Sequence, residues 1–381
     1  ESAPFNESPS LNRTTEGQFD PNHYFANGAP TGGVSVGYPT NVFTTLPVQL
    51  QFREIANDFR NSLVHKWNLA VQQELPGQMA LEVAYIGNHQ AHQLLQPDPN
   101  ACPNTPVVGA TCNESLRPTK NIGGIQGTAS FGYGNYNALT AKLEKRYSNG
   151  LQFVTAYTYG HALANSGTTL SGSTGFGYLD NQNISSSYAS AAWDIRHNLT
   201  TGFTYDIPFG KGRQFGSNMN RALNTIVGGW QANGILTLHT GAPYTLRSNG
   251  CQGYWASCLA YILPGHSPDA APSGGRSPDH WFDTTGLVSP AVGLPSTPNQ
   301  GNLGLQTNTS PPTRSLDLSI FKDFAFTERW KLQFRAESFN IANTPQFSTP
   351  DNNTQDGNFG KVTGTASGSE RHIQFSLRLQ F

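Results

Sequence analysis

Two histidines lie close together in the stretch NHQAH, and they are the first candidates for chemistry in this chain. Neutral imidazole is a common metal ligand, so His89 and His92 could share a metal ion. The stretch stands at the end of a predicted strand, however. We therefore expect exposed loop histidines there and no metal site.

An acidic and amidic stretch, DNNTQDGN, is a second candidate, in this case for calcium. It offers side-chain oxygens from Asp351, Asn352, Asn353, Asp356 and Asn358. Calcium prefers oxygen ligands, but the spacing here matches no EF-hand loop. A cluster of turn-forming residues is the better interpretation.

Glu337 is the remaining candidate, because it could act as a general acid in a soluble hydrolase. Its neighbours Lys331, Gln333 and Arg335 share its side of the chain, and Arg378 stands on the next predicted strand. A continuous polar stripe accounts for all of them, whereas an acid accounts for one. The chain has no G-x-S-x-G, P-loop or H-E-x-x-H motif. We expect no enzyme, and no catalytic, cofactor-binding or metal-binding residues.

The four cysteines form two local pairs, each in a turn-rich segment. Cys102 and Cys112 are one pair, and Cys251 and Cys258 are the other. Neither pair has the C-x₂₋₄-C spacing of a zinc site. Two disulfides across short loops, formed in an oxidising compartment, are the expected arrangement.

The composition favours a β protein with many turns over a helical enzyme. Of 381 residues only 12% are charged, while 40 are glycine, 25 are proline and 11% are aromatic. The formal net charge of -1 gives no bulk attraction to nucleic acid. No apolar run approaches the roughly 18 residues of a transmembrane helix. A membrane barrel remains possible, since its strands alternate and give a weak hydropathy signal.

Alternation of apolar and polar residues predicts about nine strands of roughly ten residues each. They are Leu63–Leu75, Met79–Gly87, Tyr136–Tyr147, Leu151–Leu163, Asp194–Ile207, Trp230–Leu246, Ser315–Phe326, Trp330–Ile341 and Arg371–Phe381. Residues 1–59 lack a sustained period and are expected to be irregular, with room for a short strand at Val48–Phe52. A short helix is expected near Asn218–Ile226.

The connections between these strands alternate between short and long. Pro76–Gln78 and Ser148–Gly150 are tight turns, whereas Gln96–Gly134, Asn165–Ala192 and Arg247–Thr313 are long polar loops. Outer-membrane barrels have short periplasmic turns and long extracellular loops. A soluble sandwich has no reason to share this asymmetry.

Aromatic residues gather at both ends of the predicted strands. Trp230 and Trp330 each follow a short connection, and Tyr157 and Tyr159 lie toward the long loops. Membrane interfaces select aromatic side chains at two such levels. Ordinary β propensity also favours these residue types, but it does not explain the equivalent places of the two tryptophans.

Five segments in order resemble the barrel of Oar-like TonB-dependent outer-membrane receptors. They are HKWNLAVQQELPGQMALEVAYIGNH, YNALTAKLEKRYSNGLQFVTAYTYGHAL, DIRHNLTTGFTYDIPFGKG, GGWQANGILTLHTGAPYT and LQFRAESFNIANTPQF, and they lie within Asn61–Phe381. The resemblance implies a barrel of about 22 strands around a plug, driven by TonB through an N-terminal region. The closing strand also resembles the signal for the barrel-assembly machinery, carried by Phe375, Leu377, Leu379 and Phe381.

The expected fold is therefore all-β: part of a transmembrane antiparallel barrel in the cell outer membrane, in contact with its lipid. Residues 1–59 would be an extracellular irregular segment and residues 60–381 the C-terminal portion of the barrel. The expected function is transport of an unknown extracellular ligand. Side chains expected in the lumen are Arg196, His239, Lys331, Arg335, Glu337 and Arg378. The alternatives are a barrel for adhesion or protein export, and a secreted glycan-binding β protein.

Overall fold

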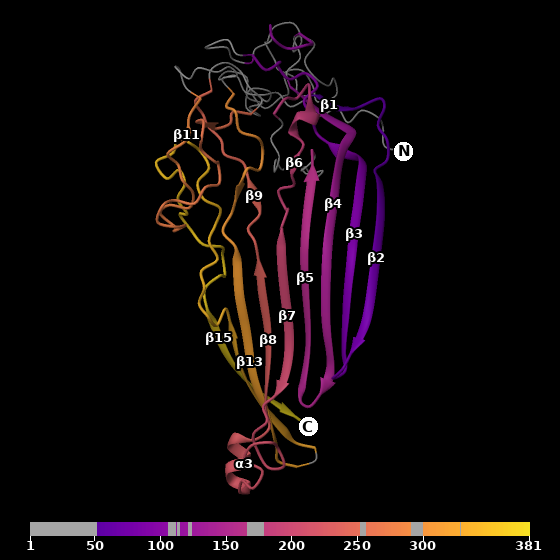
Figure 1. Ribbon diagram of the computed structural model, residues 1–381, viewed down its shortest axis with the longest axis vertical. Helices are drawn as coiled ribbons and strands as arrows, with labels where there is room; N and C mark the ends of the chain where they lie inside the picture. The colour runs from indigo at the N-terminus through magenta and orange to yellow at the C-terminus, as the bar shows by residue number, and fades with distance from the viewer. Residues whose placement is uncertain are drawn as a thin grey trace, which may run out of the picture.

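A computed structural model describes residues 52–105, 112, 115–120, 124–165, 179–251, 257–290, 300–327 and 329–381. Its main feature is one tall, twisted antiparallel sheet (Figure 1). The segment 1–51, including most of the strand predicted at Val48–Phe52, lies outside the described residues. Within them, no helix has both the length and the apolar character needed to cross a membrane.

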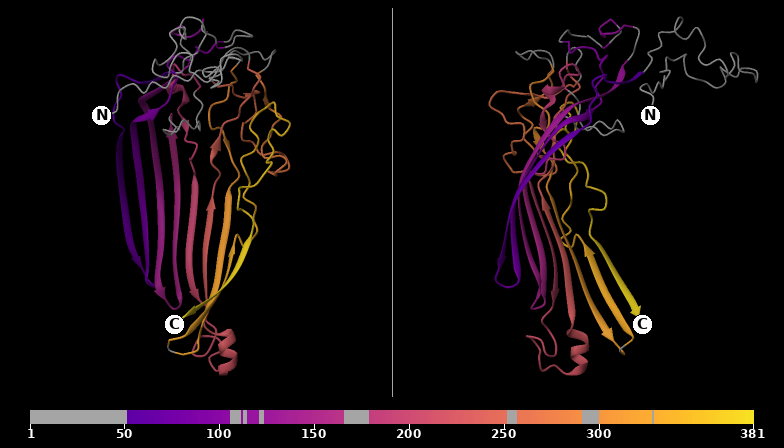
Figure 2. Two further views of the ribbon diagram at one scale, coloured as in Figure 1. Left: turned by 180° about the vertical axis from the view of Figure 1, so that it is seen from behind. Right: turned by 90° about the vertical axis from the view of Figure 1, so that its right-hand side faces the viewer.

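Nine long strands build this sheet, as the alternation predicted. They are β2 (Leu63–Leu75), β3 (Met79–Leu95), β4 (Ile125–Ser148), β5 (Leu151–Ala164), β7 (His197–Asp206), β8 (Trp230–His239), β13 (Thr313–Ala325), β14 (Lys331–Phe339) and β15 (His372–Gln380). Their spatial order is β15-β14-β13-β8-β7-β5-β4-β3-β2, so each long strand pairs with its neighbour in sequence. The sheet does not close on itself among the described residues, and β2 and β15 are its two edges (Figure 2).

All connections of one kind lie at the same end of the sheet. The tight turn between β4 and β5 places Asn149 at φ 52° and Gly150 at φ 77°, which is the conformation that an Asn-Gly hairpin turn requires. The chain reaches its C-terminus at this short-turn end (Figure 1). The other end carries the long loops, so the predicted asymmetry is present.

Short strands and helices lie at the two ends of the sheet. At the long-loop end these are β1 (Phe52–Ile55), η3 (Ile184–Ser187), β6 (Ala189–Ser190), β9 (Pro243–Tyr244), β10 (Tyr261–Ile262), β11 (Leu287–Val288) and β12 (Asn308–Thr309). The helix α3 (Arg221–Val227) stands at the short-turn end, beyond the ends of the strands (Figure 1). The side chain of Asn220 accepts a hydrogen bond from the Leu223 amide and caps this helix.

The loop predicted at Gln96–Gly134 is partly wrong, because β4 already begins at Ile125. The glycines in this stretch favour turns in the sequence, but in the structure two of them allow neighbouring backbone segments to approach closely. A Cβ at position 127 would lie 2.7 Å from the Pro97 carbonyl oxygen, and one at position 134 would lie 2.9 Å from that of Leu163. The expectation of an irregular segment up to residue 59 is wrong for β1, which pairs in parallel with the start of β4.

Most of the large buried apolar side chains gather at the long-loop end, whereas those buried along the sheet are small, such as Ala84 and Ala138. The largest cluster contains Tyr244, Leu246, Ala260, Trp281, Phe282, Leu287 and Leu303, with Ile262, Phe359 and Val362 packed against it. We call the segments that form it, residues 243–251, 257–290, 300–312 and 347–365, the cap. The long loops are thus partly a folded unit with a core of its own.

Candidate functional site: the polar face and the cap

The pairing registers give the sheet two chemically different faces. Gln333 lies opposite Arg378, whereas the next pair along the same two strands is Phe334 opposite Leu377. Side chains alternate between the two sides of a strand, so each long strand contributes to both faces. We call the side with Arg335 and Glu337 the polar face, and the opposite side the apolar face.

Four of the predicted lumen residues lie on the polar face of β14 and β15. Arg335 Nη1 lies 3.4 Å from Glu337 Oε1, and Gln374 Nε2 donates to Glu337 Oε2 at 2.6 Å. Lys331 and Arg378 occupy the same side by register. The polar stripe predicted from the sequence is therefore continuous across strands, which disfavours an isolated catalytic role for Glu337.

A cavity of about 500 Å³ lies over the middle of the sheet on this face. It is lined from β5, β7, β8, β13 and β14, and its lining includes Gln152, Thr204, Asn233, Asp317, Arg335 and Glu337. Both charge signs and several neutral hydrogen-bonding groups point into it. A surface of this kind suits contact with water or with polar protein segments.

His239 and Arg196, the other predicted lumen residues, sit at the long-loop end. His239 is the last residue of β8 and lies opposite Asn198, on the polar face. Arg196 precedes β7 and is held in a cluster, since its Nε lies 3.1 Å from Asp194 Oδ2 and its Nη2 lies 3.2 Å from His161 Nε2.

Asp194 is the centre of that cluster, and the sequence analysis did not identify it as a site residue. Its side chain is 3% exposed, yet it accepts hydrogen bonds at 2.8 Å from the Ala162 amide and contacts His161 Nδ1 at 2.8 Å. It lines a second cavity of about 420 Å³ beside Asn88, Tyr136 and Asn198. A buried carboxylate needs such partners, and the sequence signal that could have found it is the pair of basic residues, Arg196 and His197, that follows it closely at the start of β7.

The predicted interface aromatics lie on the apolar face or at its short-turn edge. Trp230 pairs with Lys322 across β8 and β13, and its ring meets Phe334 edge-on at 5.9 Å. Trp330 stands just before β14 and stacks on Phe381 at 5.3 Å. Tyr157 and Tyr159 lie at the other end of the same face, both packed near His197.

The terminal strand presents its predicted signal residues outward. Phe375 is 71% exposed and Leu377 is 68% exposed on the apolar face. Leu379 follows on the same side, and Phe381 ends the chain beside Trp330. An unbroken exposed apolar stripe of this length needs an apolar partner, because a soluble surface rarely carries one.

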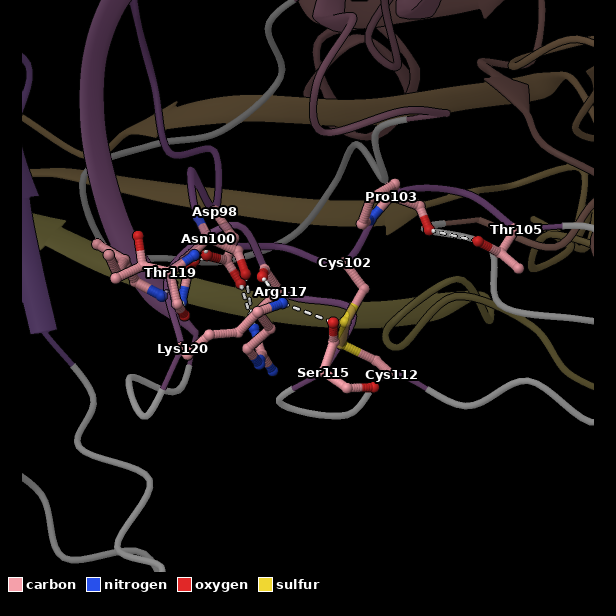
Figure 3. The surroundings of a disulfide bond; sticks show 11 residues. Asp98, Asn100, Cys102, Pro103, Thr105, Cys112, Ser115, Arg117, Thr119 and Lys120 are labelled. Atoms are coloured by element: carbon pink, nitrogen blue, oxygen red, sulfur yellow. Dashed lines mark hydrogen bonds and ion pairs between the residues drawn. A yellow bond between two sulfur atoms is a disulfide. The ribbon is translucent and has the colours of Figure 1, made fainter.

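Both cysteine pairs form disulfides in the structure. Cys102–Cys112 closes the loop after β3 (Figure 3), and Cys251–Cys258 closes a segment of the cap. Beside the first disulfide, Arg117 Nη1 donates to the Asn100 carbonyl at 2.8 Å and lies 3.8 Å from Asp98. Asn100, which is 1% exposed, also bonds Thr119 through its side chain.

The cap is held by aromatic packing and by hydrogen bonds between distant segments. The rings of Phe282 and Phe359 meet edge-on at 5.4 Å, and the Trp281 amide donates to the Gly360 carbonyl at 2.8 Å. Burial raises the pKa of the Tyr244 hydroxyl still further above physiological pH, so no charge is buried in the cap at this position. The long-loop end thus offers a preformed surface.

The prediction of exposed loop histidines is wrong, because His89 and His92 lie within β3 and are half-buried. These residues and the acidic stretch have ordinary structural partners. His89 Nδ1 lies 2.8 Å from Asn135 Oδ1, and His92 Nδ1 lies 3.3 Å from the Ser130 carbonyl. Asp351 accepts from the Asn353 amide, whose own side chain bonds Asp356. Among the residues that the structure describes, no group of three or more His, Cys, Asp or Glu side chains is arranged to hold a metal ion.

A family model for the outer membrane beta barrel domain matches residues 1–374. The chain belongs to this family. It is accordingly a partial, antiparallel transmembrane barrel of the cell outer membrane, with extracellular long loops and periplasmic short turns. The apolar face is its lipid-facing side.

Solved structures of similar shape include the outer membrane transporter YddB from Escherichia coli, with 8% identity and a TM-score of 0.43 over 87% of this chain and 34% of that one. BauA, the ferric preacinetobactin receptor from Acinetobacter baumannii, has 12% identity and a TM-score of 0.40 over 84% of this chain and 29% of that one. The chain thus spans about a third or less of their length. No curated protein matches it.

Proposed function

We propose that this chain is the C-terminal wall of a TonB-dependent receptor of the Oar-like type, which takes up an extracellular ligand. The open sheet carries this proposal. Its lipid-facing side is apolar, yet the edges β2 and β15 have no strand partner among the described residues. Unpaired backbone groups are very costly in lipid, so membrane sheets close. Further strands of the same receptor would pair with both edges.

The polar face would line the lumen of that larger barrel and touch its plug. Arg335, Glu337 and Lys331 project from one strand into the same space as Arg378, and the cavity beside them is large enough for side chains of a packed segment. His239 and Arg196 would lie nearer the extracellular mouth. The energy would come from TonB through the N-terminal region, so the wall needs no catalytic residue.

The extracellular ligand would meet the cap and the neighbouring loops. The folded core under this surface keeps its shape before the ligand arrives, which lowers the entropic cost of binding. The connections from β3 to β4, from β5 to β7 and from β8 to β13 would provide the contacts.

Two adjacent positions on β14 allow a matched test in the complete receptor. A photo-crosslinking amino acid at Arg335 faces the polar side, and one at Phe334 faces the apolar side. We expect the first to form a crosslink within the receptor, to the plug, and the second to form none. When the same receptor is immobilised on a column, it should bind and retain the periplasmic domain of TonB.

Failure of either arm has a distinct meaning. An open pore with no internal crosslink from position 335 would favour a barrel for protein export, and a crosslinked plug without TonB binding would favour adhesion. Recovery of the protein in the soluble fraction after carbonate extraction of membranes would contradict the barrel and favour the secreted β protein.

We also propose that β15 is the signal for the barrel-assembly machinery. Phe381 is 88% exposed and ends an apolar stripe, whereas Gln380 points to the polar side of the same strand. Phe381→Asp should lower the amount of heat-modifiable barrel in the outer membrane several-fold, and Gln380→Asp should not. Equal levels of the two variants would contradict this role.

A further inference from the structure

The connection between β7 and β8, residues 207–229, is much longer than the other described periplasmic turns and contains α3. Its sequence holds three basic residues, Lys211, Arg213 and Arg221, and no acidic residue. All three side chains are exposed. Arg213 lies 3.6 Å from Asp206 at the end of β7, whereas among the described residues Lys211 and Arg221 have no ion-pair partner.

The helix in this connection is amphipathic, and its apolar side is uncovered. Leu223, Ile226 and Val227 have the spacing of one helix face, and they are 46%, 67% and 37% exposed. Arg221 and Thr225 lie on the opposite side of the same helix. An exposed apolar stripe beside free basic groups is the pattern of helices that lie in a membrane interface.

Lys322 places this helix on the lipid side of the barrel wall. By register, Lys322 lies between Trp230 and Phe334 on the apolar face, where it is 4% exposed. Its ammonium donates to the Gly228 carbonyl and lies 3.5 Å from that of Asn224. A cation there complements the negative end of the helix. The helix is therefore attached to the outside of the sheet and not to its lumen.

Trp230 strengthens the same attachment at the level of the interface. Its indole Nε1 donates to the Ile226 carbonyl at 2.8 Å, and the Lys322 ammonium lies 5.7 Å from its ring centre. Indole rings favour the headgroup level of a membrane. The end of α3 is thus anchored at the depth where lipid headgroups begin, beyond the strand ends (Figure 2).

We infer that residues 207–229 form a binding site for anionic phospholipid of the periplasmic leaflet. Leu223, Ile226 and Val227 enter the boundary of the acyl chains, while Lys211 and Arg221 contact phosphate groups. The continuity of this surface with the apolar face and its unneutralised positive charge favour lipid over a protein partner.

The test uses the protein purified from outer membranes and placed in lipid nanodiscs. All four cysteines of this chain are in disulfides, so an introduced cysteine can carry an NBD label. We compare Ile226→Cys, within the apolar stripe, with Thr225→Cys, outside it; both positions are exposed. One set of discs contains phosphatidylethanolamine and phosphatidylglycerol, and the other only phosphatidylcholine.

At position 226 we expect blue-shifted emission that is quenched by a nitroxide lipid, and at position 225 quenching by aqueous iodide. Changing Lys211→Glu together with Arg221→Glu should lower the lipid-exposed population in anionic discs by roughly fivefold for each basic group lost. Equal iodide quenching at both positions would overturn the proposal. Protection of position 226 that requires a co-purified protein, or that is the same in both lipid mixtures, would also overturn it.

Discussion

The cap and the membrane-spanning sheet are both rich in large apolar side chains, but they place them in opposite surroundings. In the cap, Phe282 is 1% exposed and packs on other aromatic rings. On the sheet, Leu69 and Phe375 are each 71% exposed. The cap buries its apolar side chains within its own core, as a soluble domain does. The apolar side chains of the sheet are covered by lipid instead. Substitutions of the same type should therefore have different effects in the two regions.

The largest effect is expected for Phe282→Ala in the core of the cap. Removing a fully buried phenylalanine costs about 3–5 kcal/mol, and the cap is too small to absorb such a loss. Pulse proteolysis across a urea series should show early cleavage in the cap with the barrel band intact. Leu69→Ala is the control on the sheet, because that side chain is exposed on the apolar face and its loss leaves no packed cavity.

Removing the cap disulfide should have the next largest effect. Replacing both Cys251 and Cys258 with serine releases a short closed loop, and chain-entropy arguments give about 2.5 kcal/mol for a loop of that size. The urea midpoint for cap cleavage should fall, while heat-modifiable migration of the barrel should not change. A barrel that also loses heat modifiability would show that the two regions unfold together.

Gly241→Ala probes the junction between the two regions. A Cβ there would clash with the Ser310 carbonyl oxygen, and the amide of the same serine donates a hydrogen bond to the Ala242 carbonyl. Forcing the two backbones apart should cost about 1–3 kcal/mol. Hydrogen exchange should rise at β9 and β12 but not at β3 and β4. Unchanged exchange at β9 would mean that the junction bends freely.

The smallest effect is expected for Arg335→Ala on the polar face. The side chain of Arg335 is 40% exposed and its contact with Glu337 is long, so such an exposed pair contributes about 0–1 kcal/mol. The thermal stability of the barrel should hardly change. A loss of several degrees would show that Arg335 has a buried partner in the complete protein.

The sheet was largely predictable because each strand carries its own alternating pattern. Residues 371–381 alternate without interruption, and β15 occupies nearly that stretch. The Asn-Gly turn after β4 was equally local, since only two residues decide it. The helix predicted at Asn218–Ile226 lies within three residues of α3.

What could not be predicted depends on residues that are distant in sequence. Phe282 contacts Tyr244 and Phe359 only when three loops fold together. The alternation of apolar and polar residues along the sequence does not predict contacts of this kind. Asp194 is likewise explained by His161 on another strand. The beginning of β4 was missed because its glycines suit a turn as well as a close approach of strands.

The length of β4 has a consequence for where the protein meets its surroundings. Its 24 residues extend over roughly 80 Å at the usual rise, but crossing the hydrocarbon layer takes only about 9–11 residues of a tilted strand. More than half of the strand therefore lies outside the hydrocarbon layer. Because the turn after β4 is short, most of this excess lies on the long-loop side, so the long loops begin well above the membrane surface (Figure 1).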